Sequence, residues 1–310
     1  VDNSSYLKAS QNGQILYSIA DEGVVAFRVL SNGSLARLNS ANIRGMRGCH
    51  LSTSKADDYI FISGFHDGKI TVLNLNKDGA VGQIADGVFH KGLGSVAERS
   101  FRPHVSCSRL TPDERFLMVA DLGIDQIKVY RFDHKDGKIT LVDTIRCELE
   151  SAPKYFMFSS DGRFFYVLYE LKNMIEVYSY KEGELVPIVE KIQTIPSTGS
   201  KPNQLTAACA MHLSPDEKHL FCSNAGDNTV SMYDRDDETG MLTMRFCLPI
   251  SGDYPKDIAI FPDGKHLASI NHEGSISFFK IDYEKGLLVM SDRSIKVNEP
   301  NCCEIVKIGD

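Results

Sequence analysis

The sequence has no tryptophan, no Cys-x-x-Cys pair and no apolar run near the ~18 residues that a membrane-spanning helix requires. It also lacks a G-x-G-x-x-G fingerprint and a P-loop, so nothing indicates a nucleotide cofactor. Lys and Arg number 34 against 41 Asp and Glu, and the net charge of −7 disfavours binding to a phosphate backbone. We therefore expect no cofactor, no membrane contact and no nucleic-acid partner.

Histidine and cysteine are present, but not in metal-binding patterns. The nine His residues are scattered without the short ligand spacings of a metal site, so we expect no bound metal. A chain of 310 residues can bury a large core without disulfides, so we expect its eight cysteines to be reduced thiols. Reduced thiols are typical of a cytoplasmic protein, which is the location we expect.

An internal repeat is the most informative feature of the sequence. A turn that contains Asp or Asn, followed by an apolar run, occurs six times, and its Asp or Asn stands at positions 12, 57, 113, 161, 216 and 263. The spacings are 45, 56, 48, 55 and 47 residues. A period in this range is typical of repeat architectures built from one supersecondary unit per repeat.

Each repeat reads as four short strands. The run after the turn is β-rich, as in Phe116–Val119, and an alternating strand such as Ile127–Tyr130 follows it. A hairpin signal such as Lys135–Gly137 then leads to a further strand, and another strand precedes each turn, as in Tyr155–Phe158. Four antiparallel strands per repeat of this length predict an all-β fold, a β-propeller with four-stranded blades. A pair of stacked β-sandwiches is the alternative, but it does not explain the period.

The repeat accounts for the chain as one domain, residues 1–310. Six full blades are visible, and Cys302–Ile308 reads as the first strand of a seventh blade that is incomplete in this chain. We expect that roughly 30–40 residues needed to finish this seven-bladed β-propeller lie outside the chain, since closure removes exposed sheet edges. With no Trp, the propeller is not of the Trp-Asp repeat type.

Several short motifs give the repeat a family likeness. The sequence resembles the seven-bladed β-propeller lactonases, the family of the 6-phosphogluconolactonases and the fungal carboxy-muconate cyclase. The motifs that carry the resemblance are Arg102-Pro103-His104, Asp121-Leu122-Gly123-Ile124-Asp125, Tyr169-Glu170-Leu171, Ser223-Asn224-Ala225-Gly226 and Tyr254-Pro255-Lys256.

The resemblance implies a site at one mouth of the central channel, built from a His, a Glu and several Arg. His104 and Glu170 match the family's His and Glu and are the expected catalytic residues. Lys154 and Lys256 stand where the family has Arg, and Ala225 replaces a third Arg. Lysine keeps the charge but not the bidentate fork of arginine. Asn224, beside Ala225, is expected to contact substrate.

Polar residues also recur at one position near the start of a blade. Counted along the repeat, His50, His104, Lys154 and Lys256 occupy the same slot, where a core-facing stripe would be apolar. Equivalent positions of a repeat point to the same end of a propeller, so we expect these side chains to share one site. His50 thereby joins Lys154 and Lys256 as a substrate-binding candidate.

Two functions follow from these residues. The first is a metal-independent, 6-phosphogluconolactonase-like hydrolase of a small anionic sugar lactone, or a cyclase that runs the reverse ring closure. His104 and Glu170 would handle protons and water, and the two lysines would bind the anion or polarise the carbonyl. The alternative is a catalytically degenerate propeller that binds a small molecule or a protein, since one fold hosts many functions.

Overall fold

The computed structural model describes residues 3–95, 101–199, 205–291 and 294–308. In these ranges the chain is almost wholly β-structure, and no helix is long and apolar enough to cross a membrane. The chain divides into two compact units. Unit 1 comprises residues 1–153, 182–187 and 304–310, and unit 2 comprises residues 154–181 and 188–303.

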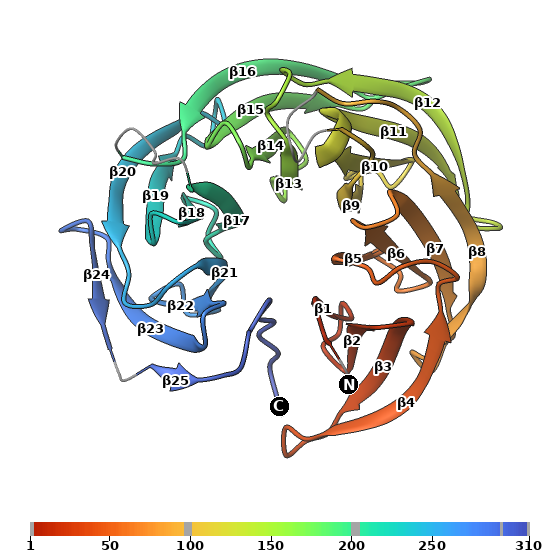
Figure 1. The fold of residues 1–310 in the computed structure, drawn as a ribbon, viewed down its shortest axis with the longest axis horizontal. Helices are drawn as coiled ribbons and strands as arrows, with labels where there is room; N and C mark the ends of the chain where they lie inside the picture. The colour runs from red at the N-terminus through yellow and green to blue at the C-terminus, as the bar shows by residue number, and fades with distance from the viewer. Residues whose placement is uncertain (1–2, 96–100, 200–204, 292–293, 309–310) are drawn as a thin grey trace. The chain divides into compact units, whose positions relative to one another are not determined.

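Three four-stranded antiparallel sheets make up unit 1 (Figure 1). The first sheet is β1 (Leu7–Ala9), β2 (Ile15–Ala20), β3 (Gly23–Val29) and β4 (Leu35–Asn42). The second is β5 (His50–Thr53), β6 (Tyr59–Gly64), β7 (Lys69–Leu75) and β8 (Val81–Phe89). The third is β9 (Val105–Leu110), β10 (Phe116–Asp121), β11 (Gln126–Asp133) and β12 (Lys138–Arg146), with a 3₁₀ turn at Leu122–Ile124.

Unit 2 repeats the same pattern three times, and only Pro153, at the start of its first strand, belongs to unit 1. Its sheets are β13 (Pro153–Phe158), β14 (Phe164–Tyr169), β15 (Met174–Lys181) and β16 (Ile188–Pro196); then β17 (Ala207–Leu213), β18 (His219–Ala225), β19 (Thr229–Arg235) and β20 (Leu242–Pro249); then β21 (Pro255–Ile260), β22 (His266–Asn271), β23 (Ser275–Asp282) and β24 (Leu287–Met290). A short strand, β25 (Ile295–Lys296), pairs with the start of β23.

The predicted turns form as the sequence indicates, and their side chains explain why. In three sheets a Ser or Thr hydroxyl donates to the Asp two residues later: Thr111 to Asp113, Ser159 to Asp161 and Ser214 to Asp216, at 2.5, 2.6 and 2.7 Å. The same carboxylate accepts the backbone N–H two residues further on. Each turn is therefore closed by its own local hydrogen bonds.

The strand after each turn forms the core. Every residue of β6, β10 and β14 is buried. In unit 1 the apolar side chains of neighbouring sheets pack face to face, with Tyr17 and Ile60 in one cluster and Phe61 and Leu117 in the next. In unit 2 the cluster around Phe221 and Ile258 does the same. Sheet stacking of this kind buries both faces of the central strands.

A polar residue at the end of the second strand ties down the segment that arrives from the preceding sheet. Asn224 donates to the carbonyl of Ser197 at 2.9 Å, and Asn271 donates to that of Ser251 at 3.4 Å. The third residue of the next strand, Ser231 or Ser277, donates to the same carbonyl. We call this arrangement the strand-end tie; it fixes each linker with neutral groups in these two sheets.

The expected strand at the C-terminus does not form. Residues 301–308 have no strand pairing in the structure, so the first strand of a seventh blade is not confirmed. Instead, Glu304 accepts the backbone N–H of Ala9 at 3.0 Å and the ammonium of Lys8 at 3.1 Å. Side-chain contacts thus hold this segment beside β1, in place of the ladder of backbone hydrogen bonds that a strand needs.

The turn carboxylates predict a loss of stability in acid. Partial burial raises the pKa of Asp161, but hydrogen bonds from Ser159 and Arg163 outweigh it and lower that pKa to about 2. A lowered pKa stabilises the fold above the unfolded value of about 3.9, and this contribution is lost as the pH falls toward 2. Asp161→Asn should therefore lower the melting temperature near pH 6, with the difference from wild type shrinking below about pH 4.

The matched control is Glu190→Gln on β16, which removes an exposed carboxylate outside the turn. Thermal melts of the three proteins from pH 6 to 2 make the measurement. A constant gap between Asp161→Asn and wild type over this range would contradict the role of the turn.

Candidate functional site

His104 lies in unit 1, directly before β9, and its ring has a defined tautomer. Its Nδ1 lies 2.7 Å from the carbonyl oxygen of Phe65, which can only accept, so Nδ1 carries the proton. In the neutral ring, Nε2 then carries the lone pair, and no hydrogen bond to Nε2 is recorded among the described residues. The Phe65 ring stacks on the imidazole at 4.4 Å between centroids. A ring held in this way presents Nε2 as a proton acceptor.

The backbone of His104 is held by the buried carboxylate of Asp121, the last residue of β10. Oδ1 of Asp121 accepts the N–H of His104 at 2.7 Å and that of Gly123 at 3.1 Å. Oδ2 accepts a hydrogen bond from Nδ1 of His90 at 2.7 Å, and neither side chain of this pair is exposed. Gly123 is required here, because a Cβ at this position would stand 1.8 Å from the carbonyl oxygen of Arg102.

The turn at residues 121–125 also holds the loop at residues 150–152. Asp125 has a left-handed backbone, with φ of 52°, and its side chain accepts the N–H of Glu150 at 2.9 Å and that of Ala152 at 2.8 Å. Ala152 stands two residues before Lys154 in the chain. The Asp121–Asp125 turn therefore anchors the backbone of His104 and the loop that leads to Lys154.

In unit 2, Lys154 and Glu170 form a short ion pair. Lys154 is the second residue of β13, Glu170 follows the last residue of β14, and Nζ lies 2.5 Å from Oε2. The side chain of Glu170 is 7% exposed and that of Lys154 is 27% exposed, so the pair is largely shielded from water but not closed off. Cys209 of β17 lies on the other side of Lys154, with Sγ at 3.6 Å from Nζ.

The environment keeps Lys154 charged. Burial alone would lower its pKa, but the nearby Cys209 and Glu170 outweigh burial and raise the pKa. Burial raises the pKa of the Cys209 thiol, so its charge acts on Lys154 only at high pH, where the thiol ionises; at pH 7 Glu170 is the anion beside the ammonium. Ala207, Cys209 and Ala225 form a small apolar cluster, against which Tyr254 packs. Position 225, where the family resemblance expects an Arg, is an alanine of this cluster. It therefore supplies no second cation beside the Lys154 ammonium.

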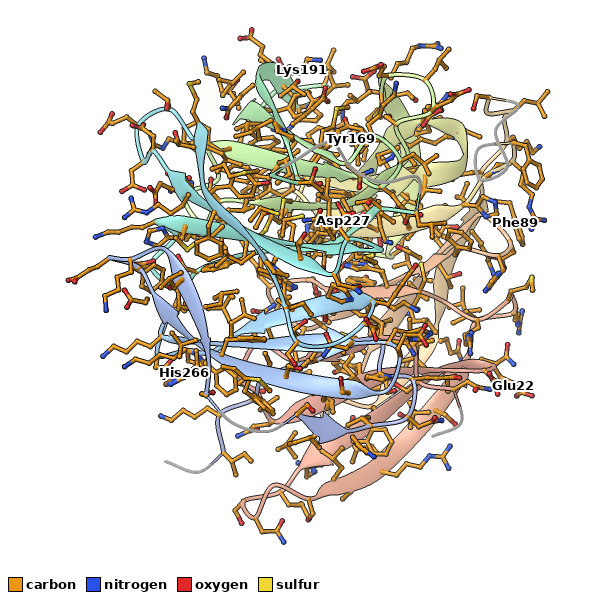
Figure 2. All side chains as sticks on the ribbon, turned by 60° about the vertical axis from the view of Figure 1, so that its left-hand side comes forward. Glu22, Phe89, Tyr169, Lys191, Asp227 and His266 are labelled. Carbon is orange, nitrogen blue, oxygen red and sulfur yellow. The ribbon has the colours of Figure 1, made fainter. Side chains whose placement is uncertain are left out.

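A second carboxylate in unit 2 fixes the strand end that carries Glu170. Glu176 accepts hydrogen bonds from the hydroxyls of Tyr169 and Tyr178 at 2.6 and 2.5 Å and from Lys191 at 2.9 Å. Burial raises the pKa of Glu176, but these donors outweigh it and lower the pKa. Figure 2 shows Lys191 at the outer edge and Tyr169 deeper inside. Because Tyr169 immediately precedes Glu170, this network positions the ion pair.

Lys256 of β21 is partly exposed and donates to Oδ1 of Asn301 at 2.6 Å. Two further hydrogen bonds hold the same C-terminal segment against this sheet. The N–H of Cys303 donates to Asp257 at 3.1 Å, and the carbonyl of Pro300 accepts from His272 at 3.3 Å. Residues 300–303 thus fix the position of Lys256.

His50 and Asn224 are enclosed by protein. The ring of His50 is 1% exposed, lies 3.6 Å from Sγ of Cys107 and packs against Tyr6. Burial first, and then Arg109 and Lys8, lower its pKa, so His50 is neutral. Asn224 is fully buried and uses its amide in the strand-end tie to Ser197. Both are placed to support a neighbouring segment.

The strand pairing shows which of His50, His104, Lys154 and Lys256 occupy the same position of the repeat. One extra residue bulges from the first strand in three sheets: Ser106 in β9, Cys209 in β17 and Lys256 in β21. Lys154 follows Pro153 as Lys256 follows Pro255, each as the second residue of its strand. His104 precedes its bulge by two residues, and His50 pairs directly with Ser63. Lys154 and Lys256 are therefore equivalent, but placing His50 and His104 in their slot was wrong. His104 lies two residues before the bulge position that Lys256 occupies in its own strand, and His50 lies in a first strand that pairs without a bulge.

The structure adds residues that the sequence interpretation missed. Asp121 stood within a recognised motif, but its bond to His104 spans 17 residues and left no local signal. No motif or periodic pattern in the sequence around His90 marks it as a functional residue. Cys209 could have been found from the bulge position that it shares with Lys256. Of the predicted residues, His50 and His104 belong to unit 1, and Lys154, Glu170, Asn224 and Lys256 belong to unit 2.

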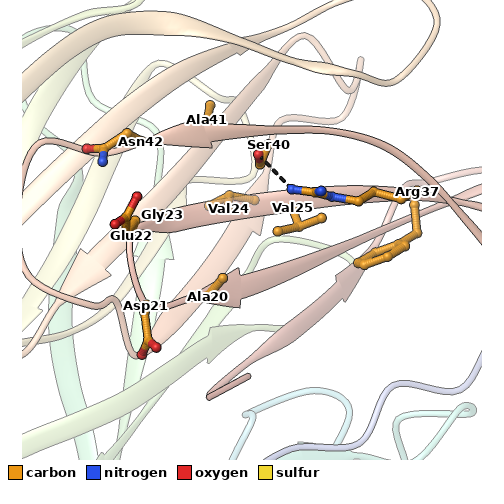
Figure 3. Close-up of a pocket in the computed structure, with 11 residues that line it drawn as sticks. Ala20, Asp21, Glu22, Gly23, Val24, Val25, Arg37, Ser40, Ala41 and Asn42 are labelled. Atoms are coloured by element: carbon orange, nitrogen blue, oxygen red, sulfur yellow. Dashed lines mark hydrogen bonds between the residues drawn. The ribbon is translucent and has the colours of Figure 1, made fainter. Parts of the chain in front are cut away.

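A pocket of about 690 Å³ in unit 1 lies elsewhere, over β3, β4 and the end of β2 (Figure 3). Asp21, Glu22 and Arg37 are among its lining residues, and none of the predicted site residues is. Arg37 is turned to Ser40, with a 3.0 Å hydrogen bond. Among the residues that the structure describes, no cluster of three or more His, Cys, Asp or Glu could hold a metal ion.

The ion pair of unit 2 gives a stability prediction. Glu170→Gln leaves the ammonium of Lys154 without its anionic partner and should lower the free energy of unfolding by about 1–3 kcal/mol. Lys154→Met should have a similar effect, because it removes the cation of the ion pair with Glu170. The double variant should lose less than the sum of the two single losses. Urea unfolding at pH 7 measures all four proteins, and strictly additive losses would contradict a coupled pair.

Comparison with known proteins places this geometry in a family. The family described as "Lactonase, 7-bladed beta-propeller" matches residues 1–305. A 6-phosphogluconolactonase of Bacillus subtilis is 27% identical over 312 residues, which cover 98% of this chain and 87% of that protein.

Solved structures agree. A Bacteroides fragilis protein assigned as a 6-phosphogluconolactonase superposes with a TM-score of 0.88 at 30% identity, covering 97% of this chain and 86% of that one. A periplasmic gluconolactonase of Pseudomonas aeruginosa superposes with a TM-score of 0.91 at 23% identity, covering 100% and 90%, and shows the same fold. The expected all-β propeller with four-stranded antiparallel blades is confirmed, as is the family resemblance. The chain belongs to the seven-bladed β-propeller lactonases, a family of lactone hydrolases.

Proposed function

We propose that this protein hydrolyses a small anionic sugar lactone without a metal ion, at a site on one mouth of the propeller channel. The observation that carries the proposal is the Lys154–Glu170 pair, which keeps a charged ammonium at the position where the family resemblance expects a cation. The Bacillus subtilis relative is named for 6-phosphogluconolactone hydrolysis, so that lactone is the first substrate to test.

Hydrolysis of a lactone needs a base, a group that stabilises the oxyanion and a proton donor. Nε2 of His104 takes a proton from water, and the water oxygen bonds to the ring carbonyl carbon. The ammonium of Lys154 stabilises the negative charge that develops on the carbonyl oxygen. The ring C–O bond then breaks, and the imidazolium returns its proton to the leaving oxygen. The product is the open hydroxy acid, and the reverse sequence would close the ring.

Glu170 serves this chemistry through Lys154. Its carboxylate keeps the lysine protonated and pointed in one direction, at 2.5 Å. An ammonium without such a partner would lose charge on burial, since burial lowers the pKa of a lysine. Asn224 and His50 contribute by fixing the strands on which they lie.

Lys256 gives the site its preference for an anion. Its ammonium donates to the neutral side-chain amide of Asn301, at 2.6 Å. A cation with an amide partner keeps its electrostatic pull on a phosphate or carboxylate group of a substrate. All eight cysteines are free thiols, which supports the further proposal of a cytoplasmic location.

The binding-module alternative has one observation in its favour. Ala225 is fully buried within the small apolar cluster, so one cation that the family resemblance expects is absent. If the folded protein binds a sugar acid but hydrolyses no lactone, the alternative function is the correct one.

A pH-stat assay on 6-phosphogluconolactone and δ-gluconolactone tests the proposal, with spontaneous hydrolysis subtracted. Wild type should release acid, and His104→Ala should lower kcat/KM by about 10²–10⁴-fold, because the base is lost. Lys154→Met should lower it by about 10²–10³-fold, because the oxyanion is left without its cation. A chelator in the assay should leave the wild-type rate unchanged.

The control is Glu190→Gln on the exposed edge of β16, which should keep the wild-type rate. The double variant of His104 and Lys154 asks whether both act in one reaction: its loss should be smaller than the product of the single losses. Wild-type rates in both single variants, with the fold intact, would refute these roles.

A further inference from the structure

The strand-end tie has a different chemistry in the sheet that carries His104. At this position β18 and β22 have Asn224 and Asn271, whereas β10 has Asp121. Each pairs with the first residue of the next strand: Thr229, Ser275 and Gln126. The position is therefore structurally equivalent in all three sheets.

The two groups that the strand-end residue meets in the tie also differ: one on the next strand, and one on the segment that arrives from the preceding sheet. The third residue of the next strand is serine in β19 and β23, but the buried Lys128 in β11. The anchored segment presents a backbone carbonyl at Ser197 and Ser251, but the imidazole of His90 after β8. Three neutral groups in unit 2 thus correspond to three ionisable groups in unit 1.

A neutral amide is sufficient to pin a linker, as the two sheets of unit 2 demonstrate. Burying an Asp, a Lys and a His costs free energy that pinning alone does not require. The distinguishing contact is that Asp121 also accepts the backbone N–H of His104, at 2.7 Å. A charged acceptor makes a stronger hydrogen bond than a neutral one.

Of the three ionisable groups, the Asp121 carboxylate is the one that contacts the backbone of His104, and His90 contacts that carboxylate. Burial lowers the pKa of His90, and Lys128 lowers it further, against the opposing effect of Asp121, so His90 is a neutral donor. Nε2 of His90 is buried and has no hydrogen-bond partner among the described residues, so the ring does not serve as a contact for solvent. The recorded side-chain hydrogen bond of His90 is the one to the Asp121 carboxylate.

From this geometry we infer that Asp121 and His90 are positioning residues for His104: the dyad fixes the backbone of His104 so that its ring keeps Nδ1 on the Phe65 carbonyl and directs Nε2 at the reacting water. The inference rests on the proposed function of His104. It assigns to the Asp-Leu-Gly-Ile-Asp turn a task in the reaction, beyond shaping the turn.

Asp121→Asn is the sharpest test, because asparagine is the residue that the equivalent ties already use. Its Oδ1 can still accept the N–H groups of His104 and Gly123, and its amide can donate to His90 in the other tautomer. We expect a folded protein in which kcat falls about 10- to 100-fold while KM stays within about two-fold, since misplacing a catalytic group affects the rate.

A readout independent of turnover is the ¹⁵N NMR spectrum of the histidine rings, with His104 assigned from the His104→Ala spectrum. Wild type should show His104 as a single Nδ1–H tautomer, and Asp121→Asn should show a tautomer mixture. If wild type hydrolyses no lactone, the proposed function fails, but the spectrum still decides whether the dyad orders the ring.

The matched control is Asn271→Ser, which weakens the equivalent tie in unit 2. It should lower the melting temperature but leave kcat and the His104 tautomer unchanged. His90→Gln, which keeps a donor for Asp121, should retain most activity, whereas His90→Leu should not; this pair decides the matter if Asp121→Asn fails to fold. Wild-type kcat and an unchanged His104 spectrum in Asp121→Asn would overturn the inference and leave a purely structural tie.

Discussion

The contact on which the site depends is the tie between the end of a second strand and the segment that arrives from the sheet before it. Each sheet is a local meander with few constraints on how its linkers run. The tie fixes each linker near the point where it leaves the last strand of the preceding sheet: Ser197 follows β16, Ser251 follows β20 and His90 follows β8. In the third sheet the tie is a buried carboxylate, which holds His104 directly. In this sheet the tie thereby also fixes the residue that we propose as the general base.

The second organising contact is the charge balance in unit 2. A lysine and a glutamate at 2.5 Å keep each other ionised in a largely buried place, where either alone would be costly. Small residues surround them, and Cys209 occupies the bulge position that is lysine in β21. The result is an ammonium that is fixed in direction yet still reachable from solvent, which suits a group that must meet a developing oxyanion.

Features that depend on contacts between residues close in sequence were predictable, and features that depend on distant contacts were not. The turns at Asp113, Asp161 and Asp216 bond within five residues, so their strands were predictable from the pattern. The likeness in short motifs identified the family. The bulges at Ser106, Cys209 and Lys256 were not predictable, because they are defined by pairing with the second strand. The slot assigned to His50 and His104 failed because both residues stand at other positions of that pairing. His90 was missed because its partner is 31 residues away. Cys302–Ile308 has β-propensity but forms no strand in the part of the chain that the structure describes.

The central proposal is that the Lys154–Glu170 pair binds the lactone. The most direct test is a crystal structure with the hydrolysis product, a sugar acid, bound to the wild-type protein. The account predicts the product carboxylate within about 3 Å of Lys154 Nζ. A product that bound only in the pocket lined by Asp21, Glu22 and Arg37, with Lys154 uncontacted, would contradict it.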